Sequence, residues 1–243
     1  MKRCFWVNMR NPAYVRYHDE EWGRPCHDDR MLYELLILEC FQSGLSWECI
    51  LNKRENFRRA YDGFAVEKVA SYGEEKIQAL LADSGLIRNR RKIEASIKNS
   101  RIFREIQREH GSFNDYIWQF TAGASLLESC TEKTTSDLSD CISRDLKRRG
   151  MAFVGSTTVY SYLQAIGIIN GHTPECEWRT LCESKTRRPD TVVTCQGCES
   201  ECQVSVGWRN GVAVVLGGNN CPTGESFALS SLREHSLPPG EDS

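Results

Sequence analysis

No stretch of this 243-residue sequence contains the roughly 18 to 20 consecutive apolar residues that a membrane-spanning helix needs. The first ten residues also lack the apolar segment of a secretory signal peptide. With 40% hydrophobic and 26% charged residues, the composition is that of a globular protein and argues against disorder of the whole chain. We therefore expect a soluble, intracellular protein without a membrane partner.

The charge distribution and the cysteine content are compatible with nucleic-acid and metal partners. The net charge of −2 is unevenly distributed, because residues 190–243 carry two basic and seven acidic residues, which leaves a net charge of +3 on residues 1–189. A basic region of this kind is compatible with a nucleic-acid partner. Twelve cysteines in an intracellular protein indicate metal ligands or free thiols rather than disulfides.

Residues 1–184 are predicted to form an all-α domain, since no sustained alternation of strand type occurs in them. Apolar residues recur at helical spacing in several stretches: after Asp28, after Ser46, over 74–82, over 90–108, after Ser136, and over Ser156–Ile169. Glycines follow most of these stretches, which predicts short connections between the helices.

Beyond a boundary near Ser184, residues 185–243 form an acidic tail that contains cysteines. Asn210-Gly211 between Gln203–Trp208 and Val212–Leu216 predicts a β-hairpin. The last two dozen residues are rich in Gly, Ser and Pro, and we expect them to be poorly ordered. Three cysteines of the tail either form a second zinc site or are free thiols: Cys195, Cys198 and Cys202.

Glu39 is an acidic residue on an apolar helix face. It follows three leucines by seven, four and three positions, which places these side chains on one side of a helix. Burying a carboxylate is costly unless the group is paired or used. Glu39 therefore either forms a buried ion pair with an arginine or serves a function beside the following turn, which contains Gly44, Leu45 and Trp47.

The first 22 residues contain many aromatic side chains: Phe5, Trp6, Tyr14, Tyr17 and Trp22. These rings either pack in the core or line a pocket, because polar residues such as Asn8 and Glu21 are interleaved with them. Flat rings beside a carboxylate would suit a purine base, above all a cationic one.

Four potential metal ligands lie near the two ends of the helical region: Cys4, His18, His172 and Cys176. Two thiolates and two imidazoles would complete a tetrahedral zinc ion and leave no open position, so the site would be structural and would join the two ends. The spacing of Cys4 and His18 is not that of a standard zinc finger, and scattered thiols and histidines are the alternative.

Basic residues gather at 53–59, 88–92 and 147–149, and a solvated helix face explains many of them. The third group ends a predicted helix, and Gly150–Thr158 leads from it into the next one. A glycine-containing hairpin at a helix N-terminus presents backbone N–H groups that can bind a phosphate.

Together these residues resemble the type I DNA-3-methyladenine glycosylases, a bacterial branch of the helix-hairpin-helix DNA glycosylase superfamily. The resemblance covers about residues 1–178 and rests on a series of ordered motifs: Arg3-Cys4, Trp6-Val7, Tyr17-His18-Asp19, Glu21-Trp22-Gly23, Leu38-Glu39, Gly44-Leu45-Ser46-Trp47, Lys53-Arg54-Glu55-Asn56, Ile87-Arg88-Asn89-Arg90, Lys147-Arg148-Arg149-Gly150 and Phe153-Val154-Gly155. It implies a helix-hairpin-helix glycosylase fold and hydrolysis of the N-glycosidic bond of 3-methyladenine in alkylated double-stranded DNA. It further implies a monomer in the bacterial cytoplasm, associated with the nucleoid.

The resemblance assigns roles to the pocket residues. Glu39 would accept hydrogen bonds from the flipped base, Tyr17 would contact it, and Trp47 would stack on it. Trp6 and Trp22 would help to close the pocket. Gly44 and Leu45 would contact DNA from the turn, with Leu45 filling the gap in the duplex. The DNA backbone would be bound by Phe153, Val154, Gly155 and Ser156. A structural zinc ion would have as ligands Cys4, His18, His172 and Cys176.

The sequence also lacks residues that other members of the superfamily use. Many of them employ an aspartate shortly beyond the hairpin glycine, but residues 159–174 contain no Asp, and no lysine lies between Gly155 and Lys185. We therefore expect neither an aspartate-driven mechanism nor Schiff-base lyase activity. An N3-alkylated adenine is already cationic and its glycosidic bond is weakened, so selective binding of the flipped base would supply much of the catalysis.

Two other functions stay open. The chain could be a zinc-stabilised nucleic-acid-binding module that has lost catalysis, or a glycosylase for another lesion such as 7-methylguanine or 8-oxoguanine. Release of free base from methylated DNA distinguishes the first from the main prediction, and a panel of modified duplexes distinguishes the second.

Overall fold

The computed structural model describes residues 1–128, 133–183, 191–196, 203–209 and 212–217. Its first part consists of helices: α1 (Pro12–Glu20), α2 (Asp29–Gln42), α3 (Trp47–Ala60), η1 (Asp62–Phe64), α4 (Val66–Ala70), α5 (Glu74–Ala82), α6 (Arg90–His110), α7 (Phe113–Trp118) and η2 (Gln119–Thr121). The second part contains further helices and short strands: β1 (Leu126–Leu127), α8 (Asp137–Arg148), α9 (Ser156–Ala165), β2 (Ile169–Asn170), α10 (Glu177–Glu183), β3 (Thr191–Thr194), β4 (Gln203–Arg209) and β5 (Val212–Gly217). Among the described residues, no helix is both long and apolar enough to cross a bilayer.

Side-chain caps fix the starts of the predicted helices. Asp28 caps α2, Ser46 caps α3 and Ser136 caps α8, in each case by accepting a hydrogen bond from a backbone N–H of the first turn. These caps, together with the predicted extent of α5, confirm the mostly helical class. The prediction omitted α1, α4, α7 and α10, which are short and lack a long periodic pattern.

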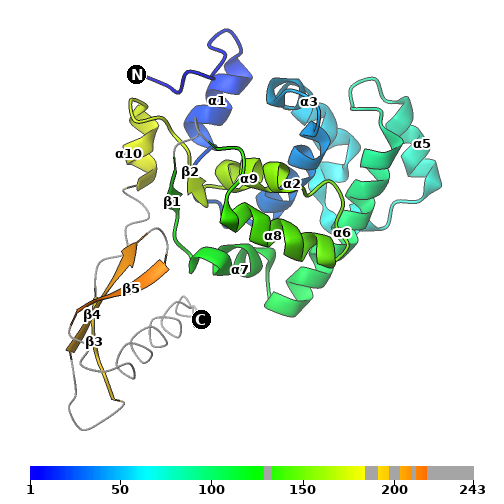
Figure 1. Cartoon of the computed structure of the whole chain (residues 1–243). Coiled ribbons are helices and arrows are strands. Elements are labelled where there is room, and N and C mark those ends of the chain that lie inside the picture. Colours follow the sequence, from blue (N-terminus) through cyan, green and yellow to red (C-terminus); the bar gives the residue numbers. More distant parts are fainter. Residues whose placement is uncertain (129–132, 184–190, 197–202, 210–211, 218–243) are drawn as a thin grey trace, which may run out of the picture.

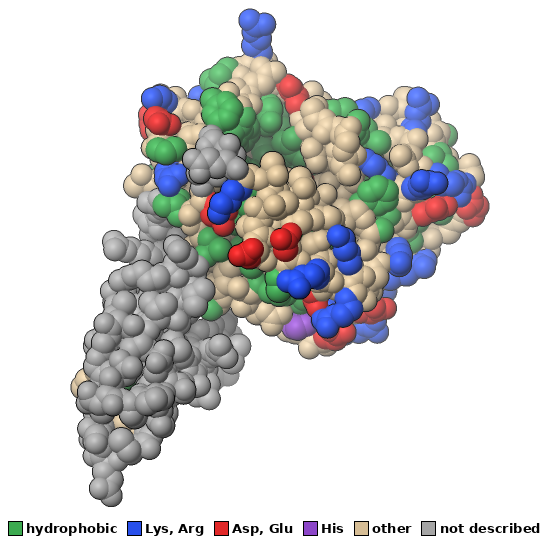
Figure 2. Space-filling model, viewed as in Figure 1, with side chains coloured by type: hydrophobic (Ala, Val, Ile, Leu, Met, Phe, Trp, Pro, Cys, Tyr) green, Lys and Arg blue, Asp and Glu red, His purple; other side chains and the backbone are tan. Residues whose placement is uncertain are grey.

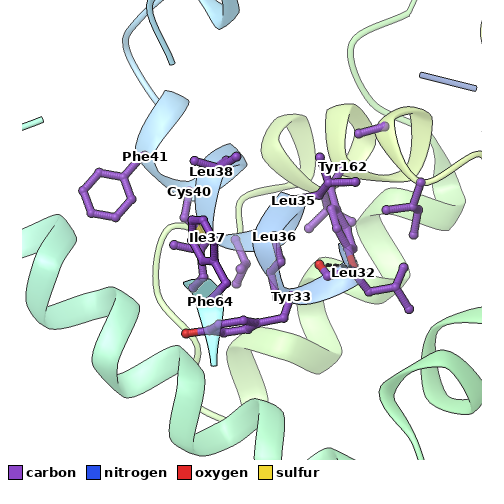
Figure 3. Close-up of a cluster of buried hydrophobic side chains, with 14 of the residues drawn as sticks. Leu32, Tyr33, Leu35, Leu36, Ile37, Leu38, Cys40, Phe41, Phe64 and Tyr162 are labelled. Carbon is purple, nitrogen blue, oxygen red and sulfur yellow. Dashed lines mark hydrogen bonds between the residues drawn. The ribbon is translucent and has the colours of Figure 1, made fainter. Parts of the chain in front are cut away.

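Helix α2 runs through the centre of the helical region (Figure 1). Ten consecutive residues of α2, from Leu32 to Phe41, are buried, so this helix is covered on all sides. Tyr162 of α9 packs against it and donates a hydrogen bond to the carbonyl of Leu32 at 3.0 Å (Figure 3). Glu39 lies near the end of this buried helix and is therefore held on one of the most enclosed elements of the fold.

Helix α9 ends earlier than predicted. It stops at Ala165 rather than at Ile169, because Gly167 takes a φ of +74° that turns the chain into β2. The two residues of β2 pair with β1 in parallel, which is too short a ladder to leave an alternating pattern in the sequence. A β-carbon at Gly167 would lie 2.2 Å from the carbonyl carbon of Arg24, so this position requires glycine on two grounds.

Replacing Gly167 with alanine should lower the free energy of unfolding by about 3 kcal/mol or more, since the new methyl group meets backbone and the φ is strained. Urea unfolding followed by circular dichroism measures the effect. Gly73→Ser is the control, because a β-carbon at Gly73 meets nothing within 4 Å and the residue is the N-cap of α5. Equal stabilities of the two variants would contradict the packing described for Gly167.

The C-terminal part contains the predicted strand pair. Strands β4 and β5 are antiparallel, with Arg209 opposite Val212. A third strand, β3, pairs with β4 and was not predicted. The predicted boundary near Ser184, the turn residues, the last two dozen residues, and Cys198 and Cys202 lie outside the described residues.

Candidate active site and metal centre

A pocket of about 210 Å³ lies between α1, α2, α3 and α9. Figure 2 shows hydrophobic side chains around a hollow between α1 and α3. The volume is below the roughly 300 to 1,000 Å³ of sites for drug-sized ligands, which suits a single base. Aromatic and polar side chains from both ends of the helical region line it: Trp6, Tyr14, Tyr17, Trp22, Glu39, Gln42, Trp47, Ser161 and Gln164.

Glu39 lies in this pocket without a charged partner. Its side chain is buried, and no hydrogen bond or ion pair joins it to any residue that the structure describes. Burial alone raises the pKa of Glu39 from 4.5 to about 8. The nearby buried arginine, Arg54, pairs with Glu34 at 2.5 Å and with Glu21 at 2.8 Å instead. The alternative of a Glu39–arginine ion pair is therefore wrong.

The predicted rings form the walls of the pocket. Tyr17 is buried, and its ring centroid lies 5.1 Å from that of Trp47. On the other side, the rings of Trp6 and Trp22 meet edge to face at 4.7 Å. The buried indole N–H of Trp47 has no hydrogen-bond partner among the described residues, so it remains available as a donor. Phe5, in contrast, is 76% exposed and lines neither core nor pocket.

Three polar lining residues were not predicted: Gln42, Ser161 and Gln164. Gln42 is the last residue of α2, directly before the turn that the sequence singled out, and it was given no role. Ser161 and Gln164 lie three positions apart on α9, and hence on one face of it. This spacing of two polar residues in the second half of α9, which is otherwise apolar or aromatic, was the available signal.

Cys4, His18, His172 and Cys176 form a buried cluster whose ligand atoms all lie within 4.8 Å of one another. Nδ1 of His172 is 3.4 Å from both sulfur atoms, and Nε2 of His18 is 3.5 Å from Sγ of Cys176. A tetrahedral zinc ion with ordinary bond lengths would place sulfur and nitrogen ligands about 3.6 Å apart. The cluster could therefore hold a metal ion, as the sequence predicted.

Groups outside the cluster contact three of the four donors. Nδ1 of His18 pairs with the Asp19 carboxylate at 2.8 Å, and Nε2 of His172 lies 3.2 Å from the carbonyl of Trp22. Each imidazole thus has one nitrogen engaged and the other directed at the cluster, which is the usual arrangement of histidine ligands. Burial raises the pKa of the Cys4 thiol, and the N–H of Thr173, which points to its Sγ at 3.4 Å, acts in the opposite direction.

The cluster of Cys4, His18, His172 and Cys176 packs against the aromatic wall of the pocket. The ring of His18 meets that of Trp6 at 5.3 Å, and the ring of His172 meets that of Trp22 at 4.7 Å. Cys4 and Trp6 also belong to the same short N-terminal segment. Loss of the cluster should therefore displace the two tryptophans that line the pocket.

Two loops carry the remaining predicted residues. The first, here called the wedge turn, comprises residues 43–46, in which Gly44 has a φ of +80° and Leu45 is 37% exposed. The second, here called the hairpin, comprises residues 149–155 between α8 and α9. In it Phe153 takes a φ of +58°, which is uncommon outside glycine, and Val154 is buried. No side chain caps α9, so no side-chain acceptor at its N-cap, Gly155, takes up the backbone N–H groups of its first turn.

The basic groups are less available than the sequence suggested. Arg54 is buried in the ion pairs described above. Arg148, at the end of α8, and Arg149, the first residue of the hairpin, both pair with Asp145. Figure 2 shows acidic and basic side chains together over α8.

Comparison with known proteins identifies this mostly helical fold, with one buried carboxylate in a pocket of aromatic rings, as that of a DNA glycosylase. Residues 6–180 match the model of the family described as methyladenine glycosylase. The chain belongs to this family.

Curated and solved relatives are similar to the helical part. DNA-3-methyladenine glycosylase 1 of Escherichia coli (strain K12) is 41% identical over 180 residues, which cover 72% of this chain and 96% of that protein. The structure of 3-methyladenine DNA glycosylase I from Staphylococcus aureus is 32% identical, with a TM-score of 0.70 over 74% of this chain and 97% of that one. A structure of a variant 3-methyladenine DNA glycosylase I in complex with 3-methyladenine has the same identity and TM-score, over 74% of this chain and 98% of that one.

Proposed function

We propose that this chain hydrolyses the N-glycosidic bond of 3-methyladenine in alkylated double-stranded DNA, acting as a monomer, with the flipped base held in the Glu39 pocket. The observation that carries the proposal is the unpaired, buried carboxylate among aromatic rings. Family membership and the relatives that bind 3-methyladenine support it. Tyr17 would contact the base, Trp47 would stack on it, and Trp6 and Trp22 would close the pocket around it.

The charge of Glu39 explains the choice of base. In the empty pocket, burial favours the protonated form of its carboxyl group. A cationic purine offsets the cost of the buried carboxylate, whereas a neutral adenine leaves that cost in place. As the glycosidic bond breaks, the base becomes neutral and the positive charge moves to the sugar. The carboxylate still attracts this positive charge, so it also stabilises the transition state.

The two loops supply the contacts to DNA. Leu45 is the exposed apolar residue of the wedge turn, and we infer that it fills the space that the flipped base vacates, with Gly44 allowing the turn to approach the duplex. Helix α8, the hairpin and α9 would form the helix-hairpin-helix element, in which Phe153–Ser156 binds the phosphate backbone through backbone N–H groups.

The buried cluster is proposed to bind a structural zinc ion. Its two thiols and two imidazoles leave no ligand position for a substrate, so the ion would hold the segments of Cys4 and Cys176 together and take no part in hydrolysis. The Asp19 and Trp22 contacts of the two histidines support this assignment.

Release of free bases from a panel of duplexes tests the proposed reaction. We expect wild-type protein to release 3-methyladenine from methylated DNA, with far slower release of 7-methylguanine, 8-oxoguanine and unmodified adenine. Binding of these duplexes without release of any base would instead identify a binding module. Faster release of another lesion would reassign the substrate.

Replacing Leu45 with glycine should reduce kcat/KM for 3-methyladenine release by about tenfold. The state with the base flipped out loses the apolar contacts that Leu45 makes in the vacated space, and these contacts contribute a modest free energy. Thermal stability should change little, since the side chain is exposed. Leu127→Ala, at an exposed leucine of β1 outside the pocket and the wedge turn, is the control. Undiminished release by the Leu45 variant would remove the wedge role.

A further inference from the structure

Lys92 is a buried cation without an acidic partner. It lies on α6 with only 8% of its surface exposed, and no salt bridge joins it to any described carboxylate. Its ammonium group donates to the carbonyls of Phe41 at 2.7 Å and Ser43 at 2.6 Å. These carbonyls belong to the last turn of α2 and the first residue of the wedge turn. Lysine is seldom buried without an ion pair, so the position calls for a specific explanation.

The same ammonium group also faces the hairpin. It lies 5.9 Å from the centroid of the Phe153 ring, within range of a cation–π contact. Phe153 is the residue of the hairpin with the positive φ. Lys92 thus contacts both loops that are proposed to touch DNA.

Asn99 provides a second link from α6 to the hairpin. Its Nδ2 donates to the carbonyl of Ala152 at 2.9 Å, while its Oδ1 accepts from the N–H of Ala152 at 2.8 Å. Asn99 follows Lys92 by seven positions, so both side chains project from the same face of α6. Two buried polar side chains, two turns apart, therefore connect α6 to the hairpin. Lys92 also connects α6 to the end of α2.

We propose that Lys92 is a positioning residue that holds the wedge turn and the hairpin at a fixed separation, so that insertion of Leu45 and binding of the DNA backbone occur together. The proposal rests on the proposed DNA glycosylase function. Lys92 reaches the substrate only through these loops, because it is absent from the pocket lining. Asn99 holds the hairpin backbone while Lys92 sets the end of α2 against it.

The consequence is a defect specific to duplex substrates. Without the ammonium group, the carbonyls of Phe41 and Ser43 lose their donor and the wedge turn is free to shift relative to the hairpin. The pocket is built from other side chains and should still bind the free base. Extrusion of the base from DNA, which needs both loops at once, should become less favourable.

The test compares Lys92→Met, Lys92→Arg and the control Lys68→Met, which changes an exposed lysine of α4. Three quantities are measured: binding of free 3-methyladenine by tryptophan fluorescence, kcat and KM for release of 3-methyladenine from methylated duplex DNA, and the fluorescence of 2-aminopurine placed beside an abasic analogue in a duplex. The last reports insertion of the wedge without any chemistry. If Lys92→Met does not fold, Lys92→Gln replaces it with the same expectations.

We expect Lys92→Met to bind free 3-methyladenine within about twofold of wild type and to lose at least about tenfold in kcat/KM on DNA. The 2-aminopurine signal should fall in parallel, Lys92→Arg should restore part of both, and Lys68→Met should match wild type. Unchanged kcat/KM and unchanged 2-aminopurine signal would overturn the proposal, as would an equal loss of free-base binding. If wild type itself releases no base, the proposed function is refuted. The 2-aminopurine measurement on the abasic duplex still tests the role of Lys92, because it requires no base release.

Discussion

Replacing Glu39 with glutamine should stabilise the protein at neutral pH while it impairs excision. Burial raises the pKa of Glu39 from 4.5 to about 8, so the folded state binds this proton more tightly than the unfolded state does. A raised carboxyl pKa makes wild-type stability fall as pH rises from about 4.5 to about 8. Glutamine carries no such proton, and at pH 7 the variant should be more stable by on the order of 2 to 3 kcal/mol.

Urea unfolding between pH 4 and pH 9 measures this effect. The difference between wild type and Glu39→Gln should be near zero at pH 4, should grow through neutral pH and should level off above pH 8. Glu75→Gln, on an exposed residue of α5, serves as the control and should leave the pH profile unchanged. A variant less stable than wild type at pH 7 would mean that the carboxylate has a stabilising partner, contrary to the unpaired group described above.

Loss of the proposed zinc site should lower the stability of the protein strongly. Cys176→Ser should reduce zinc by one equivalent per chain and lower the free energy of unfolding by at least about 3 kcal/mol, because metal-binding energy contributes directly to folding. Excision should decline as well, since His18 and His172 pack against Trp6 and Trp22. Metal analysis and thermal unfolding of the same samples provide the measurement.

Cys141→Ser is the matched control, because Cys141 is an exposed cysteine on α8 outside the cluster. It should leave zinc content and stability unchanged. A strong chelator should bring wild type to the stability of Cys176→Ser and should have little further effect on that variant. Wild-type protein that is fully folded and free of metal would end the assignment.

Sequence periodicity was sufficient for the long helices because their signals are local. Asp28, Ser46 and Ser136 are N-caps that precede apolar residues at helical spacing, and each begins a helix in the structure. The end of α9 could not be predicted in the same way. It depends on Gly167 meeting the backbone of Arg24, which is distant in sequence. The β1–β2 pair is likewise formed by segments far apart in the chain.

The candidate site could be predicted at the position where a charged residue lies on an apolar helix face. Glu39 is acidic on an apolar helix, and the structure places it in the aromatic pocket. The sequence could not predict which carboxylates pair with Arg54. Its pairs with Glu34 and Glu21 form because α3 packs against α2 and against the end of α1. Lys92 was counted only as one of the basic residues at 88–92, and its buried position was not predicted, since its partners are backbone carbonyls that every residue possesses.

The most direct test of the central claim is the release of 3-methyladenine from methylated duplex DNA by wild type and by Glu39→Gln at equal concentrations of folded protein. We expect the variant to bind the duplex about as tightly as wild type and to release base about 10²- to 10³-fold more slowly, the usual consequence of removing one preorganised electrostatic group. Release at the wild-type rate would contradict the role of this buried carboxylate.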